Sequence, residues 1–399
     1  MRFLHIKMIS TIHDQLIDYP TPVVGFLSSF GSLAGICLTI QLITGVLLVA
    51  HYTPHVVYAF SSVEHIMRDV NDGWLLRYIH SNGASIFFLI VYIHILKNSN
   101  STEPDILLWY SGALIYIIIM ATAFMGYVLP WGQMSFWGAT VITNLFAAIP
   151  VVGVDIAQWL WGGFSVDNPT LNRFFSFHYL MPFILAAVVI LHLALLHLDE
   201  STEDDDAEED HVSFYPYYYF KDLFALFLLL LVFIFFVYFK PNYFSHPDNY
   251  TLASMNVTPS HLVPEWYFLI FYSILRCVPD KFGGLIIMGL TLFITLIDIT
   301  DLESDEENFD DSIINNFEQN YQTNYVNFLV NGEETNDFPV SYEFIYALIT
   351  GWLGGQSIEE PYPDIAAMET LMLFFDFSST LNFLQNSVHS VFYKDAEED

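Results

Sequence analysis

Four histidines stand at two identical spacings inside long apolar segments, and this pattern constrains the chain more than any other. His80 and His94 are 14 residues apart, and so are His178 and His192. Fourteen residues of α-helix make almost four turns, so both members of a pair face the same side of their helix. They are separated by about 21 Å along the axis, most of the roughly 30 Å thickness of a membrane's hydrocarbon core. The pattern predicts paired imidazoles at two depths of a membrane.

The composition supports insertion into a membrane. The 399 residues are 54% apolar and include only 11 Lys plus Arg. Segments 23–50, 106–130 and 174–198 contain no charged residue, and each is long enough to span a bilayer. We therefore predict an all-α polytopic membrane protein with about eight transmembrane helices, near 26–50, 75–97, 107–130, 173–198, 221–240, 282–299, 342–356 and 365–390.

The negative charge of the chain is concentrated in short segments. The net charge is −33, and acidic residues cluster at 199–210 and 298–311. Such runs are typical of solvated loops or disorder, and they argue against nucleic acid as a partner. We expect an N-terminal domain at 1–215 that ends in the first acidic loop. A C-terminal domain at 216–399 would include a polar insertion at 300–341.

The cysteines and the N-terminus exclude several classes of protein. Cys37 and Cys277 are far apart, and neither belongs to a cysteine-pair motif. Covalent attachment of c-type haem and a cysteine-bound iron–sulfur cluster are therefore excluded within this chain. Residues 1–20 show no secretory signal, because they lack a continuous apolar core with a cleavage site.

The histidines have the chemistry of haem ligands. A single imidazole in a spanning helix is more often a polar core residue bonded to a neighbour, but four with this doubled spacing are hard to explain as packing. The second and fourth crossings run in the same direction, so His80 shares a depth with His178, and His94 with His192. Neutral imidazole is a good axial ligand for haem iron, and two per iron favour electron transfer. The first four helices would therefore form a di-haem bundle.

Glycines in the other two helices of this bundle repeat the same interval. Gly31 and Gly45 are 14 residues apart in the first crossing, as are Gly112 and Gly126 in the third. Small residues also let membrane helices pack closely, which is an alternative explanation for any one of them. The shared interval favours the other interpretation, in which each glycine leaves room for a porphyrin face.

Longer motifs resemble a known family. They are YVLPWGQMSFWGATVITN at 127–144, WGGFSVD at 161–167, PEWY at 264–267, and the run at 275–284. Together they resemble the cytochrome b family of respiratory quinol:cytochrome c oxidoreductases, the bc1 complexes. The resemblance extends from about 11 to about 299, with a weaker match at 352–356.

The resemblance implies two non-covalent b-type haems, each bound through its iron by one histidine couple. His80 and His178 would hold the low-potential haem. His94 and His192 would hold the high-potential haem. Arg77 would balance a propionate of the first haem. Lys97 stands where relatives often have an arginine, and it pairs with anions but lacks the planar fork of a guanidinium.

A quinol-oxidising pocket at one membrane face is also implied. Glu265 would accept a proton from quinol, because a carboxylate at the lipid edge can have a pKa near neutrality. The alternative is that Glu265 is only an acid at a helix N-terminus after Pro264. Gly138 would keep the pocket open. The full set comprises Met120, Phe124, Tyr127, Gly138, Pro264, Glu265, Tyr267 and Tyr272.

A quinone-reducing site at the opposite face would use His197 and Asp222 to deliver protons, with Ser201 and Lys221 beside them. The acidic run around Ser201 departs from the usual loop of the family. Tyr215 stands where many relatives have a histidine.

The resemblance further implies ubiquinol and ubiquinone as substrates, with electron transfer coupled to proton translocation in a Q cycle. The partners would be a Rieske-type iron–sulfur subunit, cytochrome c1, other complex III subunits and membrane lipid, in a dimeric complex. The mitochondrial inner membrane is the expected location, and a bacterial plasma membrane is the alternative.

Three other interpretations stay open at this point. A photosynthetic b6f-type relative would usually divide these helices between two chains. A channel or transporter would use the intramembrane histidines as a proton relay, and a scaffold subunit would hold no haem. The last two predict no haem absorbance.

Overall fold

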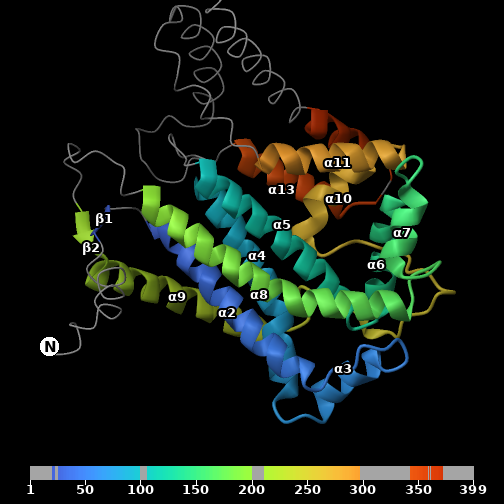
Figure 1. Ribbon diagram of the computed structural model, residues 1–399, viewed down its shortest axis with the longest axis horizontal. Coiled ribbons are helices and arrows are strands. Elements are labelled where there is room, and N and C mark those ends of the chain that lie inside the picture. Colours follow the sequence, from blue (N-terminus) through green and yellow to red (C-terminus); the bar gives the residue numbers. More distant parts are fainter. Residues whose placement is uncertain are drawn as a thin grey trace, which may run out of the picture.

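The computed structural model is a bundle of long helices with shorter helices at one end and one side (Figure 1). It describes residues 20–22, 26–98, 106–199, 211–296, 342–357, 359 and 361–371. Among these residues, strands occur only as β1 (Pro20–Pro22) and β2 (His211–Ser213), which pair antiparallel. The predicted all-α class is confirmed apart from this short ladder.

Four long helices form the central bundle. They are nearly free of charge and apolar on most of their circumference, as expected of helices that satisfy their backbone groups internally in lipid. The first follows a 3₁₀ turn, η2 (Phe26–Ser29). α4 packs along α2, and α5 packs along α8. The four are α2 (Phe30–Val49), α4 (Gly73–Asn98), α5 (Ile106–Val128) and α8 (Asn168–Asp199).

A fifth long helix, α9 (Phe214–Phe239), packs against α2 and α4. It begins several residues before the predicted start at 221. Tyr215 has a non-helical backbone conformation, and regular helix follows from Pro216, whose ring suits a first helical position. Within the described residues, these five helices are long and apolar enough to cross a membrane.

The later helices are short within the described residues. α10 (Leu269–Arg276), α11 (Lys281–Leu296) and α13 (Tyr342–Gly354) have 8, 16 and 13 residues, against the roughly 20 that a perpendicular crossing needs. Residues 362–371 are also helical. Most of the expected eighth crossing at 365–390 lies outside the described residues, as does the insertion at 300–341. The described part therefore supports five long spans, whereas the sequence predicts about eight.

One end of the bundle is covered by the connections between α2 and α4, between α5 and α8, and after α9. They contain α3 (Ala59–Arg68), α6 (Gln133–Phe146), α7 (Gly153–Trp161) and η3 (Pro247–Tyr250). In Figure 1 these elements lie toward the right, while β1 and β2 lie at the left. A β-bridge between Gly132 and Leu252 joins two of the connections.

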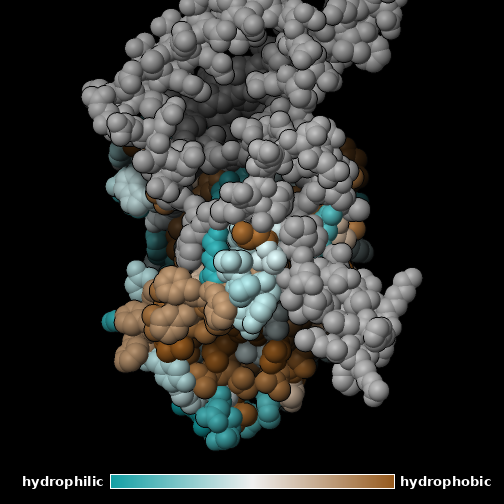
Figure 2. Space-filling model, turned by 90° about the vertical axis from the view of Figure 1, so that its left-hand side faces the viewer, coloured by the Kyte–Doolittle hydropathy of each residue, from teal (hydrophilic) through white to brown (hydrophobic). Residues whose placement is uncertain are grey.

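The outer surfaces of α8 and α9 are strongly apolar. Ile190 is 69% exposed and Phe227 is 56% exposed. Figure 2 shows a broad hydrophobic area on the described surface viewed from the side of β1 and β2. Apolar surface of this extent requires a lipid or protein environment. The chain is an integral membrane protein.

Asn249 on η3 caps the helix that carries Gly138. Its Oδ1 accepts a hydrogen bond from the backbone N–H of Ser135 at 3.0 Å. Gly132, the N-cap residue of α6, offers no side chain for this purpose. An added Cβ at Gly132 would lie 2.3 Å from the Asn249 carbonyl oxygen, so the two segments approach as closely as a glycine allows.

We expect Asn249→Ala to lower the free energy of unfolding by about 1 kcal/mol, because it leaves the backbone N–H of Ser135, in the first turn of α6, without its acceptor. The measurement is the thermal midpoint of the detergent-solubilised protein. Asn256→Ala, at an exposed position in the same connection, is the control and should leave the midpoint unchanged. Equal midpoints for both variants would contradict the capping role.

Candidate functional site

The structure brings the four histidines together in the predicted couples. His80 on α4 and His178 on α8 have ring centroids 6.2 Å apart, with the rings perpendicular at 88°. His94 and His192, one helical interval further on, lie close enough for their charges to interact. Equal spacing on two co-directional helices therefore produces two couples at two depths.

Hydrogen bonds from neighbouring helices orient the first couple. The His178 Nδ1–H donates to the carbonyl of Thr122 on α5 at 2.8 Å. The Thr44 hydroxyl on α2 donates to the Ile40 carbonyl at 2.6 Å, so its oxygen accepts from the Nδ1–H of His80 at 3.0 Å. In both residues Nδ1 carries the proton, and Nε2 keeps the lone pair that a metal requires.

In the second couple, only His192 is oriented by a comparable hydrogen bond. The Ser111 hydroxyl on α5 donates to the Leu108 carbonyl at 2.7 Å and accepts from His192 Nδ1 at 2.7 Å. His94 has a looser neighbour, because the Asn98 amide nitrogen is 3.5 Å from either ring nitrogen. Three of the four imidazoles thus have a defined tautomer.

Each predicted glycine faces one of these imidazoles. An added Cβ would approach the ring Cε1 of its histidine to 2.4 Å at Gly126 and to 3.1 Å at Gly45, against ordinary contact of 3.4 Å or more. The glycines, which were predicted to leave room for a porphyrin face, also let each imidazole approach the neighbouring helix. The partners are Gly31 with His94, Gly45 with His80, Gly112 with His192, and Gly126 with His178.

The arrangement fits haem iron better than an all-protein metal site. Each couple supplies only two nitrogens, and no group of three His, Cys, Asp or Glu residues gathers among the described residues. A porphyrin supplies the remaining four ligands of a bis-imidazole iron. The backbones of α4 and α8 have almost no close approach, whereas both pack tightly on other helices, so the couples stand between separated helices.

Cationic residues lie beside both couples. Arg77, one turn before His80, acts electrostatically on that ring and on Glu265. Lys97 acts likewise on His94. Both cations are thus positioned to interact with an anionic group bound at the couples, such as a carboxylate.

The PEWY segment is held against the bundle by aromatic contacts. The ring of Tyr267, in the 3₁₀ turn η4 (Trp266–Phe268), stacks on Phe88 of α4 with centroids 4.0 Å apart. The Tyr92 hydroxyl donates to the Tyr267 carbonyl at 2.5 Å. Tyr267 is only 5% exposed, so its ring anchors the segment in the core of the bundle.

Glu265 is the titratable group that this segment presents. Its carboxylate accepts a hydrogen bond from the Tyr127 hydroxyl. Burial raises the pKa of Glu265 to about 7, although the Tyr127 bond and the charge of Arg77 oppose the rise. Glu265 occupies the N-cap position of η4 but makes no side-chain capping bond, so helix capping does not account for it.

The other predicted pocket residues surround this segment to different degrees. Tyr272 on α10 donates its hydroxyl to the Leu262 carbonyl at 3.2 Å, two residues before Pro264. Gly138 on α6 has no atom within 4 Å of an added Cβ. Met120 and Phe124 are partly buried on α5. Met120 packs against one hydrophobic core of the bundle, and Phe124 packs against the other.

The second predicted site lies where α8 ends and α9 begins. His197 is in the last turn of α8, and Asp222 follows the first turns of α9. The Lys221 ammonium donates to the Ser28 hydroxyl at 3.4 Å and stands 4.9 Å from the Tyr218 ring centroid. Ser201 lies outside the described residues.

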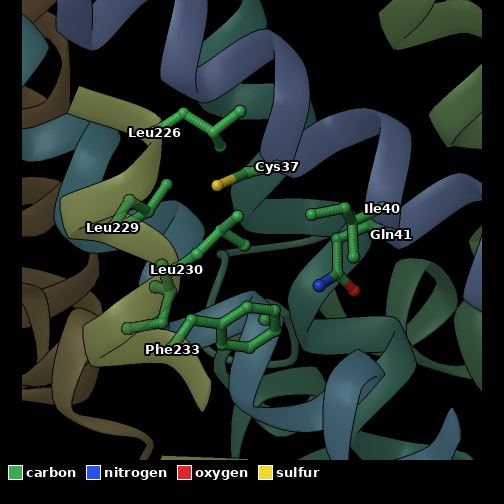
Figure 3. Close-up of a pocket in the computed structure, with 9 residues that line it drawn as sticks. Cys37, Ile40, Gln41, Leu226, Leu229, Leu230 and Phe233 are labelled. Carbon is green, nitrogen blue, oxygen red and sulfur yellow. The ribbon is translucent and has the colours of Figure 1, made fainter. Parts of the chain in front are cut away.

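A narrow pocket opens beside the bundle, between α2, α4 and α9 (Figure 3). Leu226, Leu230 and Phe233 line it from α9, and Cys37 and Gln41 from α2. Its walls are almost wholly apolar and include none of the histidines, so it is separate from the histidine couples.

Sequence reasoning missed the residues that orient the imidazoles. Thr44, Ser111 and Thr122 were not singled out, because a hydroxyl or carbonyl in an apolar helix has no distinctive pattern by itself. A usable signal was present in two of the three cases. Thr44 and Ser111 each directly precede one of the spaced glycines.

Comparisons with known proteins agree with the geometry. A family model described as "Cytochrome b/b6/petB" matches residues 16–200, and one described as "Cytochrome b(C-terminal)/b6/petD" matches residues 252–308. Proteins named cytochrome b include one from Chondrus crispus, 48% identical over 94% of this chain and 95% of its own length. The one from Cyanidium caldarium is 49% identical over 96% of each chain. The one from Phytophthora megasperma is 54% identical over 74% of this chain and 79% of its own length.

A solved structure is similar over the same extent. A chain of "Hyperthermophilic respiratory Complex III" superposes with a TM-score of 0.79 at 29% identity. The match covers 95% of the present chain and 97% of that chain. The likeness therefore extends beyond the histidine bundle to the later helices.

Proposed function

Because the chain belongs to the cytochrome b family, we propose that it is the di-haem subunit of a quinol:cytochrome c oxidoreductase, complex III. The observation that carries this proposal is the pair of histidine couples with Nδ1 protons held by neighbouring helices. That arrangement presents the Nε2 lone pairs of His80 and His178 at one depth and that of His192 at the other. The similar chain from a respiratory complex III supports it.

His80 and His178 would hold a low-potential b haem, and His94 and His192 a high-potential one. When bound, the haems supply one-electron carriers at two depths of the membrane. The protein's part is to fix the imidazoles and to neutralise the propionates. Arg77 and Lys97 stand beside the first and second couple for the latter purpose.

Quinol oxidation would take place beside Glu265. A hydroxyl of quinol donates its proton to the carboxylate, and the Tyr127 hydroxyl steadies the charge that Glu265 carries before the transfer. A pKa of about 7 lets the carboxylate accept a proton near neutral pH and release it to water afterwards. The partly exposed edge of the segment gives that proton a way out.

Quinone reduction would take place at the other end of the bundle. His197 and Asp222 would supply the two protons, with Lys221 and Ser201 beside the ring. Quinol oxidation at one face and quinone reduction at the other would couple electron transfer to proton translocation in a Q cycle. The substrates would be ubiquinol and ubiquinone.

The partners follow from what this chain lacks. Among the described residues both cysteines are free thiols, so an iron–sulfur centre and a c-type haem must come from other subunits. We propose a Rieske-type subunit and cytochrome c1 in a dimeric complex of the mitochondrial inner membrane. Relatives from algae and land plants, at similar identity over most of their length, support the mitochondrial setting.

A b6f-type function is less well supported. Both family models match within this one chain, and the relatives named cytochrome b are covered over most of their length. A proton channel would leave the glycine interval unexplained. A haem-free scaffold would leave the imidazoles without a reason to be oriented.

Removing the His178 imidazole, or the space that Gly126 leaves for it, should remove haem from the first couple. We expect His178→Leu to lose the lower of two potential waves in a redox titration followed by reduced-minus-oxidised spectra. Gly126→Ala should do the same or shift that wave, because the new Cβ would lie 2.4 Å from the His178 ring. Gly35→Ala on α2, which meets nothing within 4 Å, is the control. A colourless parent protein would refute the proposed function.

The pH profile should report Glu265. We expect kcat/KM for quinol oxidation to rise with pH and to level off above about 7, because only the ionised carboxylate accepts a proton. Glu265→Gln should lose this inflection and at least about 100-fold in rate. Glu64→Gln, at a partly exposed position on α3, is the matched control. An unchanged inflection in Glu265→Gln would assign the titration to another group.

Gly138→Ala should weaken quinol binding without lowering the stability of the fold. The methyl group meets no protein atom within 4 Å, and alanine is the better helix former by about 1 kcal/mol, so stability should not fall. We expect a raised KM for quinol and weaker binding of inhibitors of the oxidising site, because the methyl occupies open space. Steady-state kinetics and inhibitor titration are the measurements. Unaltered values for both would remove Gly138 from the pocket.

A further inference from the structure

Arg276, the last residue of α10, binds the end of another helix. Its guanidinium donates to the carbonyls of Leu353 and Gly354 at 3.0 and 2.9 Å, and to that of Gln356 at 3.0 Å. These belong to the C-terminal end of α13, where carbonyls have no partner within the helix. A cation is also favoured there by the helix dipole. The guanidinium therefore serves as the C-terminal cap of α13.

The two helices meet backbone to backbone at this point. An added Cβ on Gly354 would lie 2.1 Å from the carbonyl oxygen of Leu269, the first residue of α10. Leu353 and Ile274 at this contact are 1% and 0% exposed. Since glycine is the residue that permits such an approach, α13 cannot shift along α10 without breaking the contact.

The same guanidinium also touches a residue of the quinol-oxidising segment. It lies 4.4 Å from the centroid of the Tyr272 ring, one turn earlier on α10. The Tyr272 hydroxyl donates to the Leu262 carbonyl at 3.2 Å. Leu262 immediately precedes Val263, Pro264 and Glu265. An unbroken series of contacts thus runs from the end of α13 through Arg276 and Tyr272 to the chain that carries Glu265.

We propose that Arg276 is a positioning residue for quinol oxidation. By binding the end of α13, it fixes the Tyr272 ring, and Tyr272 in turn fixes the segment that presents Glu265. Only a planar guanidinium reaches several carbonyls while stacking on an aromatic face, and a lysine ammonium is a point charge that does not. This inference rests on the proposed function. It also gives Gly354, within the weak sequence match at 352–356, a physical reason, because an added Cβ there would lie 2.1 Å from the Leu269 carbonyl oxygen.

The test is Arg276→Lys in the intact complex, which keeps the charge and removes the fork. We expect KM for quinol and the dissociation constant of an oxidising-site inhibitor to rise by about 10- to 100-fold, as for small displacements of positioned groups. Both haem waves, and haem reduction from the quinone-reducing side, should match the parent. Arg68→Lys, on exposed α3, is the control. Parent-like KM and inhibitor binding in Arg276→Lys would overturn the proposal.

A double-variant cycle distinguishes positioning from a general structural role. Tyr272→Phe keeps the ring under the guanidinium but loses the bond to Leu262. If Arg276 acts through Tyr272, the dissociation constant of the inhibitor in the double variant should lie within about twofold of that in the single variant that binds it less tightly. If the two substitutions weaken inhibitor binding independently, so that their fold-changes multiply in the double variant, the proposal is overturned. If the complex with Arg276→Lys does not assemble, the test uses Tyr272→Phe alone. A KM for quinol equal to that of the parent in Tyr272→Phe would show that the bond to Leu262 does not position the segment, and would overturn the proposal.

These measurements distinguish a failure of the proposed function from a failure of the positioning role of Arg276 alone. A parent complex without b-type haem or quinol oxidation would refute the proposed function itself. An active parent with an indifferent Arg276→Lys variant would leave that function standing and remove only the positioning role.

Discussion

An imidazole inside lipid must find partners for both of its nitrogens, and the rest of this structure follows from how that is achieved. The hydroxyls of Thr44 and Ser111 and the carbonyl of Thr122 each take an Nδ1 proton, on helices next to those that carry the histidines. This fixes which nitrogen remains basic and where it points. The couples therefore depend on α2 and α5 as much as on α4 and α8.

The pairing of helices serves the same need. α2 packs on α4, and α5 packs on α8, while the two histidine-bearing helices stay apart. Glycines allow the close approach within each pair, so that an imidazole reaches a hydroxyl or carbonyl opposite it. A side chain at Gly126 would move the ring of His178, and the couple would lose its geometry. Close contact within the pairs and separation between them are two parts of one arrangement.

How far the sequence predicts this arrangement depends on the range of each interaction. The 14-residue interval predicts the couples, because helix geometry converts spacing into position directly. The role of Glu265 follows only from resemblance, since its bond to Tyr127 joins segments distant in the chain. Arg276 carries no sequence signal for its contacts with Leu353 and Gly354. The described residues contain five helices long and apolar enough to cross a membrane, and the later three of the eight expected crossings stay a prediction.

The two kinds of chemistry proposed for this chain require different supports. Electron carriers need fixed ligands in a dry interior, which long helices with uniform spacing provide. A proton acceptor needs a route to water, so Glu265 stands on irregular backbone at the end of the bundle, close to the exposed residue His261 in the chain. Irregular backbone has no ladder of hydrogen bonds to hold it in place. Its position must come from outside, from Tyr92 on one side and from the contacts of Tyr272 with Arg276 on the other.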